Sequence, residues 1–348
     1  MKKRGLRNRF LKPAWTLHKW LGLIFALPVL ITALTGAFLV HYQWIERSFD
    51  QEVFRSSSAS EENHLPLEAI IFKTSARHPD WNPRFIEAPG AKDRNVVISL
   101  AAAEGNWTVI ADAISGEELV VRAQDQGPRR WLLALHANLF LGSTGDWIVG
   151  ATSLMLFVAG VTGLWLYGKG WEYPFRLRTL LKDSHRHIGF YNLLLLVIIA
   201  LTGFLLTLTN ILSGKKPFEP AQIDWSTIPS LDAIVDAALE ASGGGTPDYL
   251  ALPRNADDSF HIAIFHRHRN WWEKFDQFEF DAKTGALAAS YLGTGDDIVM
   301  KVNSLVGALH FGHQGGFIMK WLYFVSGSIS CWLAISGFII WKRRRKKR

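Results

Sequence analysis

The chain has 348 residues, of which 49% are hydrophobic, and its 15 Trp and 22 Phe exceed what one ordinary soluble core uses. Its formal net charge is +7, but the basic residues concentrate next to apolar runs, a pattern typical of membrane topology signals and not of nucleic-acid binding. The only cysteine, Cys331, excludes a disulfide framework, a CxxCH haem attachment and a thiolate metal cluster.

Four apolar stretches follow one another along the chain, and each is long enough, at about 20 residues, to cross the hydrocarbon core of a bilayer. None contains Lys, Arg, Asp or Glu, and aromatic residues lie at most of their ends, as expected at the headgroup level. We therefore predict a helical membrane protein with four transmembrane helices, at residues 20–42, 147–167, 188–212 and 321–341.

The positive charges predict how these helices are oriented. Lys and Arg dominate residues 1–19, the loop 168–187 and the tail 342–348, whereas 43–146 and 213–320 contain more acids than bases. Because short loops rich in Lys and Arg stay on the cytoplasmic side, we expect both termini in the cytoplasm and two domains outside.

The sequence also reads as two copies of one plan. Each half has a span, an outer domain, an apolar interfacial segment and a second span. Each outer domain begins with a helix-like stretch, continues in alternating strands and reaches an Asp-x-x-Ser/Thr-Gly turn. We predict two parallel span-domain-span repeats, each with a small α+β domain. The domains are 43–128 and 213–297, and the interfacial segments are 129–146 and 298–320.

Each span contains a Thr-Gly or Ser-Gly step, which lets a helix or a flat cofactor approach closely. Four histidines keep register with these glycines. His18 and His185 each precede a glycine by 18 residues, and His136 and His310 each precede one by 27. The glycines are Gly36, Gly203, Gly163 and Gly337, respectively.

These histidines predict haem binding, because ionisable residues at membrane depth are functional candidates and imidazole is a common axial ligand of haem iron. His18 and His185 fall at the cytoplasmic end, and His136 and His310 at the outer end. We expect two noncovalent haems, each held by two histidines. As second choices, His41 and His313 could replace an outer ligand, meet a propionate or line a route to the outer haem.

One further cluster lies outside the spans, in the run from His266 to Trp272. Arg267, Arg269, Trp271 and Trp272 could hold an anionic or catecholate-like ligand by charge and stacking, although a solvated β-turn has the same composition. No nucleotide-binding or hydrolytic motif is present in the sequence.

The segments around the four histidines resemble the signatures of PepSY-associated transmembrane proteins, and the two acidic turns are similar to the ending of the PepSY domain. The resemblance covers almost the whole chain, through residues 17–22, 135–142, 183–189 and 309–312 and the turns 112–116 and 281–285. It implies a bacterial inner-membrane protein with two b-type haems and periplasmic PepSY-like domains. One departure is His187, two residues after His185; register with Gly203 favours His185 as the ligand.

The resemblance further implies a ferric-siderophore reductase for iron uptake, which takes electrons from a cytoplasmic or quinol donor. Two alternatives stay open: a quinol-linked haem b cytochrome serving another periplasmic partner, and a non-redox regulatory PepSY membrane protein. A transporter without redox chemistry would need a polar route through the spans, which contain no charged residue. Lipid is the expected neighbour of the spans, and no nucleic-acid partner is expected.

Overall fold

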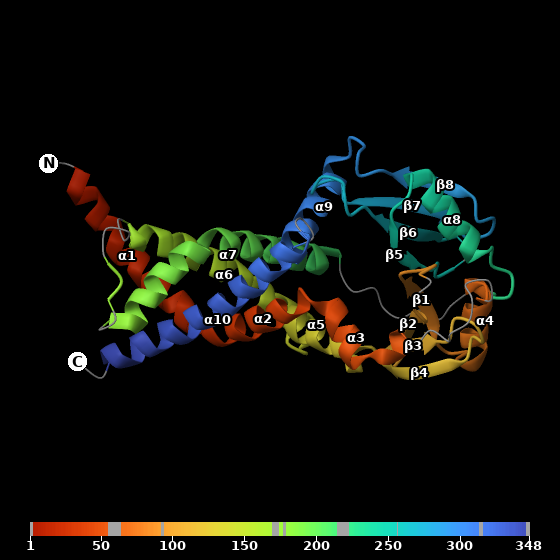
Figure 1. Ribbon diagram of the computed structural model, residues 1–348, viewed down its shortest axis with the longest axis horizontal. Helices are drawn as coiled ribbons and strands as arrows, with labels where there is room; N and C mark the ends of the chain where they lie inside the picture. The colour runs from red at the N-terminus through yellow and green to blue at the C-terminus, as the bar shows by residue number, and fades with distance from the viewer. Residues whose placement is uncertain are drawn as a thin grey trace. The chain divides into compact units, whose positions relative to one another are not determined.

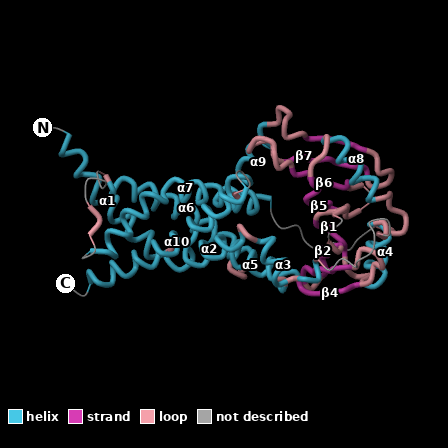
Figure 2. The backbone as a smooth tube through the Cα atoms, viewed as in Figure 1, coloured by secondary structure: helices cyan, strands magenta, loops and turns pink. Residues whose placement is uncertain are grey.

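The structure is a computed structural model that describes residues 3–54, 64–91, 94–168, 174–176, 179–213, 223–255, 257–312 and 316–345. The chain forms two compact units (Figures 1 and 2). The first, here called the membrane unit, contains Met1–Tyr42, Leu132–Lys215 and Leu309–Arg348. The second, the sheet unit, contains Gln43–Trp131 and Lys216–Ala308.

The membrane unit is a bundle of apolar helices. Helices α6 (Gly142–Tyr167), α7 (Leu180–Ser213) and α10 (Gly316–Arg345) are each long and apolar enough to cross a membrane. Helices α1 (Lys3–Ile24) and α2 (Ala26–Leu39) make a fourth span if the bent pair counts as one. The packed pairs are α2 with α10, α10 with α7, α7 with α6, and α6 with α1. Shorter helices α5 (Pro128–Asn138) and α9 (Ile298–Phe311) precede α6 and α10.

The first predicted span is bent, which the sequence prediction of one stretch over 20–42 did not include. The axes of Leu11–Ile24 and Ala26–Leu39 differ by 66°. Pro28 accounts for the bend, because it has no N–H to donate to the carbonyl of Ile24, and its ring clashes with that same carbonyl in a straight helix. Regular hydrogen bonding resumes at Val29, whose N–H donates to the carbonyl of Phe25 at 2.9 Å.

The sheet unit is built on one antiparallel sheet of eight strands in the order β4-β3-β2-β1-β5-β6-β7-β8. The first half has α4 (Leu67–Arg77) followed by β1 (Asn82–Glu87), β2 (Val96–Ala102), β3 (Gly105–Ala111) and β4 (Glu118–Ala123). The second has α8 (Leu231–Ser242), β5 (Thr246–Ala251), β6 (Ser259–Phe265), β7 (Phe275–Asp281) and β8 (Leu287–Tyr291). The unit also contains helix α3 (Tyr42–Phe49), two short 3-10 turns, Gln51–Val53 and Gln124–Gln126, and residues 298–308 of α9.

The two α+β domains expected from sequence are therefore joined. Strands β1 and β5 pair at the centre of the sheet, where Ile86 lies opposite Leu250. Residues of both halves share one buried cluster, which includes Ile70 of α4 and Ile234 of α8. Because each half supplies part of this core, the two halves fold as one unit.

The two helices that cover the sheet cap each other. The backbone N–H of Leu67, at the start of α4, donates to the carboxylate of Asp232 at 3.0 Å. The N–H of Leu231, at the start of α8, donates to the carboxylate of Glu68 at 3.0 Å. Each helix thus supplies the acceptor that satisfies an orphan N–H of the other.

The predicted acidic turns are also formed, and they have the same geometry in both halves. The Oδ1 atom of Asp112 accepts from the N–H and hydroxyl of Ser115, and that of Asp281 accepts from the N–H and hydroxyl of Thr284. Gly116 and Gly285 have φ of 68° and 69°, a conformation that glycine adopts without strain.

Candidate functional site

Each of the four registered histidines places its ring on a glycine of the partner span in its own half of the sequence. A Cβ atom on Gly36 would lie 2.8 Å from Cε1 of His136, and one on Gly203 would lie 2.9 Å from Cε1 of His310. The corresponding distances are 3.2 Å from Gly163 to His18 and 3.3 Å from Gly337 to His185. In each half, therefore, the histidine before the first span docks on the glycine of the second span. The histidine before the second span docks on the glycine of the first.

The two histidines of the first half have the same two kinds of Nδ1 partner, a backbone carbonyl and a threonine hydroxyl. Nδ1 of His136 lies 2.8 Å from the carbonyl oxygen of Thr32 and 3.1 Å from the hydroxyl of Thr35. Nδ1 of His18 lies 2.9 Å from the carbonyl oxygen of Ala159 and 3.3 Å from the hydroxyl of Thr162. In each case the carbonyl belongs to the residue four before the glycine, and the hydroxyl to the residue directly before it.

The second half repeats these offsets. Nδ1 of His310 lies 3.2 Å from the hydroxyl of Thr202, and His310 hydrogen-bonds the backbone of Ile199. Nδ1 of His185 lies 2.8 Å from the hydroxyl of Ser336, and His185 hydrogen-bonds the backbone of Leu333. A carbonyl oxygen only accepts, so Nδ1 carries the proton and donates it. A neutral imidazole then presents an unprotonated Nε2, the form that binds a metal.

The four rings form two pairs, one histidine from each half. The ring centres of His18 and His185 are 6.3 Å apart with an interplanar angle of 85°. Those of His136 and His310 are 6.2 Å apart with an angle of 45°. Two imidazoles on opposite sides of one metal are separated by about 6 Å between ring centres, since a metal–nitrogen bond is about 2 Å and the ring centre lies about 1 Å further.

Each pair would provide two ligands to a metal. Among the described residues, no group of three or more His, Cys, Asp or Glu side chains could hold a metal ion. Two imidazoles suit a metal whose remaining ligands come from a flat macrocycle, as in haem. The two pairs lie at opposite ends of the bundle, because His185 and Gly203, on which His310 rests, are 18 residues apart on α7, or about 27 Å along its axis.

The second-choice histidines differ from these four. His187 has both ring nitrogens engaged, Nδ1 at 3.1 Å from the hydroxyl of Tyr167 and Nε2 at 3.1 Å from Nη2 of Arg186. His41 packs its ring 5.0 Å from that of Trp321, and its buried Nε2 has no hydrogen-bond partner in the described part of the chain. His313 lies outside the described residues.

One contributor to the site was missed by sequence reasoning. The hydroxyl of Tyr323, on α10, donates to the carbonyl of Leu309, and the Tyr323 ring would lie 3.4 Å from a Cβ on Gly312. Tyr323 is 3% exposed. It therefore fixes the last turn of α9 on either side of His310. An aromatic residue in a span is ordinarily read as an interfacial anchor, and nothing in the spacing distinguishes this one.

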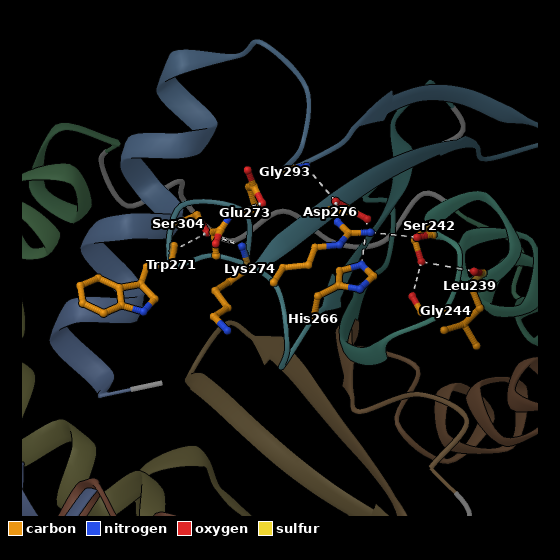
Figure 3. A network of polar contacts seen from close by, with 12 residues as sticks. Leu239, Ser242, Gly244, His266, Trp271, Glu273, Lys274, Asp276, Gly293 and Ser304 are labelled. Carbon is orange, nitrogen blue, oxygen red and sulfur yellow. Dashed lines mark hydrogen bonds and ion pairs between the residues drawn. The ribbon is translucent and has the colours of Figure 1, made fainter. Parts of the chain in front are cut away.

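The predicted ligand-binding cluster lies between the end of β6 and the start of β7, and Figure 3 labels Trp271 of this cluster. Arg269 is engaged within the protein, because its guanidinium donates to Asp276 at 2.7 Å and to the carbonyl of Ser242 at 3.0 Å. Arg267, Trp271 and Trp272 are exposed. The cluster therefore separates into one internal ion pair and three outward side chains.

Comparison with known proteins gives a match over almost the whole chain. A family model described as "PepSY-associated TM region" matches residues 15–344. No curated protein matches the sequence. A crystal structure of a protein from Clostridium difficile 630, described as a lipoprotein, is 10% identical with a TM-score of 0.29, covering 69% of this chain and 98% of that one. A TM-score this low carries no argument about the fold.

Proposed function

The chain belongs to the family of the PepSY-associated transmembrane region, and we propose that it is a dihaem electron-transfer protein of the bacterial inner membrane. In this proposal it reduces ferric siderophore iron in the periplasm, for iron uptake, with electrons from a cytoplasmic or quinol donor. The enzyme class would be a ferric-chelate reductase.

The observation that carries the proposal is the pairing of the four histidines. Each ring donates through Nδ1 and leaves Nε2 for a metal, and the ring centres are 6.3 Å and 6.2 Å apart in the two pairs. His18 and His185 would hold the inner haem, and His136 and His310 the outer one. Bound haem supplies reversible one-electron chemistry, while the protein sets its potential through axial ligation, hydrogen bonds to those ligands and burial.

The matching halves support a duplicated architecture of two parallel span-domain-span repeats. In all four docking sites the backbone partner of the histidine is four residues before the glycine, and the hydroxyl is one residue before it. The acidic turns and the helix caps also correspond between the halves. In this proposal Lys and Arg mark the cytoplasmic side, so both termini would lie in the cytoplasm and the sheet unit in the periplasm.

Reduction is a chemically sufficient way to release iron from a siderophore. Hard oxygen donors bind the more highly charged Fe(III) more strongly than Fe(II), so one electron weakens the complex without breaking the ligand. The same membrane features would serve a quinol-linked cytochrome that feeds another periplasmic partner. The oxidant separates these two functions, and a haem-free protein would instead point to a regulatory role.

The test is an optical spectrum of the purified full-length protein, oxidised and then reduced with dithionite, with a pyridine haemochrome count per chain. The proposal expects two low-spin b-type haems that reoxidise when a ferric siderophore is added. In His136→Ala, one haem should remain and reoxidation by the chelate should stop. Absence of haem, or unchanged chelate reduction in the variant, would contradict the proposal.

A further inference from the structure

A small cavity lies within the sheet unit, beside the loop that joins β1 to β2 and the start of α4. Its volume is about 50 Å³, and it is partly open to solvent. A cavity of this size holds a few water-sized groups, at roughly 10–15 Å³ each. Its wall has an apolar part, which includes Leu65, Ile86 and Ala113, and a charged part, formed by Glu87, Arg94 and Asp232.

The loop that lines this cavity has an unusual backbone. Ala88 has a φ of 43°, in the left-handed region that residues with a Cβ atom rarely adopt. Its N–H donates to the carbonyl of Asp248 on β5 at 2.8 Å, and its own carbonyl accepts from the N–H of Ala91 at 3.2 Å. A strained residue that its neighbours hold in place is typical of a binding site.

Arg94 is the charged group of this wall that lacks an acceptor. Its Nε and Nη2 atoms are buried and have no hydrogen-bond partner in the described part of the chain. The nearby carboxylate of Glu87 does not serve, because it accepts from Arg129 and Arg130. The guanidinium carbon of Arg94 lies 5.7 Å from the ring centre of Phe54, near the limit of a cation–π contact. Two buried N–H groups therefore remain to be satisfied.

The acids around the cavity restrict what anion can enter it. Glu87 and Asp232 both line the wall, and the charge of Arg94 also acts on Glu46. Asp232 accepts from the N–H of Leu67 at 3.0 Å, and burial raises the pKa of its carboxyl. These negative groups would repel a doubly charged anion such as phosphate, whereas a single negative charge can be balanced by Arg94.

We propose that this cavity binds a carboxylate carried on a short aliphatic group. The Nε and Nη2 atoms of a guanidinium form a planar fork that matches the two oxygens of a carboxylate. The wall of Leu65, Ile86 and Ala113 suits the aliphatic part. Both nitrogens are shielded from solvent, so binding includes a rotation of the Arg94 side chain, which the long contact to Phe54 opposes only weakly.

Two sources present this chemistry, a free short-chain acid and the aliphatic C-terminal residue of a peptide. The site uses residues of the sheet unit alone. The inference therefore does not depend on haem binding or on the reduction of a ferric chelate.

The experiment is hydrogen exchange, followed by mass spectrometry, on the full-length protein in a maltoside detergent. Sodium butyrate should slow amide exchange at residues 88–91 and 94–96 and leave the turn at residues 281–285 unchanged. Butyramide, which has the same shape without the charge, should give no protection. The peptide Gly-Gly-Val and its C-terminal amide separate the two sources. Protection by the free peptide at lower concentration than butyrate would assign the site to a chain end, and protection by butyrate alone would assign it to a free acid.

In Arg94→Gln, the butyrate concentration for half-maximal protection should rise about tenfold or more, because the charged fork is lost. Arg94→Lys keeps the charge without the fork and should lie between this variant and the parent. The matched control is Arg267→Gln, since Arg267 is exposed and does not line the cavity. Equal protection by butyrate and butyramide in the parent protein would overturn the proposal even if the variants fail to fold. Stronger protection by inorganic phosphate than by butyrate, or unchanged butyrate binding in Arg94→Gln, would overturn it as well.

Discussion

At the level of single residues, the glycine of each Thr-Gly or Ser-Gly step makes room for an imidazole ring. The four sites are not equally tight. A Cβ on Gly36 would meet His136 at 2.8 Å, whereas one on Gly163 would meet His18 at 3.2 Å. Real Cβ atoms essentially never approach a heavy atom closer than about 3 Å, so the first substitution forces the ring to move and the second requires only a small adjustment.

Replacing Gly36 with Ala should therefore reduce the haem content at the His136–His310 pair. The displaced ring cannot keep both its Nδ1 hydrogen bond and its distance to His310, and ligation requires both. Haem per chain, measured by pyridine haemochrome, should fall toward one in Gly36→Ala and stay near two in Gly163→Ala. Gly22→Ala is the matched control, because a Cβ there meets nothing within 4 Å. Full haem content in Gly36→Ala would contradict the docking geometry.

Tyr323 offers a subtler residue-level test. Phenylalanine keeps the packing against Gly312 but removes the hydrogen bond to the carbonyl of Leu309, at a cost of about 1 kcal/mol. Because that carbonyl directly precedes His310, Tyr323→Phe should alter the low-spin EPR signal and the midpoint potential of one haem while leaving the other unchanged.

The control for Tyr323 is Tyr191→Phe, since Tyr191 is 77% exposed. Both variants should keep two haems per chain. Equal effects of Tyr323→Phe on the two haems would show that the hydroxyl acts on the bundle as a whole and not on the His310 end.

At the level of elements, local signals in the sequence were sufficient for the spans and the acidic turns. A long apolar stretch indicates a helix, because a segment in lipid must form all of its backbone hydrogen bonds within itself. The Asp-x-x-Ser/Thr-Gly pattern indicates a turn, because the Asp side chain accepts hydrogen bonds from the residue three positions later. The bend at Phe25 was not predicted, because hydropathy alone does not indicate bends. Pro28, which lies inside the apolar stretch, is the residue that indicates it.

The joined sheet could not be predicted in the same way. Alternating residues identify a strand but not its neighbour, and the pairing of β1 with β5 joins residues more than 160 positions apart, such as Ile86 and Leu250. The geometry within the histidine pairs lay beyond the spacing as well. The sequence spacings of 18 and 27 residues related each histidine to a glycine further along the chain. Which glycine each histidine ring contacts depends on how the spans pack, and the spacings do not contain that information.

The exchanged helix caps lead to a prediction about the sheet unit. Glu68→Ala removes the acceptor of the Leu231 N–H, and Asp232→Ala removes that of the Leu67 N–H, so each should lower the stability of the sheet unit by about 1 kcal/mol. Hydrogen exchange should show faster amide opening at the start of α8 in the first variant and at the start of α4 in the second.

The crossed effect distinguishes this arrangement from ordinary self-capping. Asp236→Ala, at an exposed position of the same helix as Asp232, is the control and should leave exchange at α4 unchanged. If Glu68→Ala accelerates exchange only within α4, its own helix, then the two halves do not cap each other as the structure indicates.

At the level of the whole molecule, the two histidine pairs define a direction across the bundle. They are about 27 Å apart along α7, and each contains one histidine from each half of the chain. Removing one pair should therefore leave the other haem bound but disconnected from one of its two redox partners. In the proposed function, loss of the His18–His185 pair disconnects the electron donor, and loss of the His136–His310 pair disconnects the ferric siderophore.

In His185→Ala, the remaining haem should no longer be reduced by a quinol or cytoplasmic reductant in inverted membrane vesicles, although dithionite should still reduce it. In His310→Ala, the donor should still reduce the remaining haem, but a ferric siderophore on the opposite side should no longer reoxidise it. His187→Ala is the control for the first variant, because both nitrogens of His187 are engaged by Tyr167 and Arg186, and it should keep two haems. Normal reduction of His185→Ala by the donor would mean that electrons enter at the His136–His310 end, which would reverse the proposed direction while leaving the haem assignments intact.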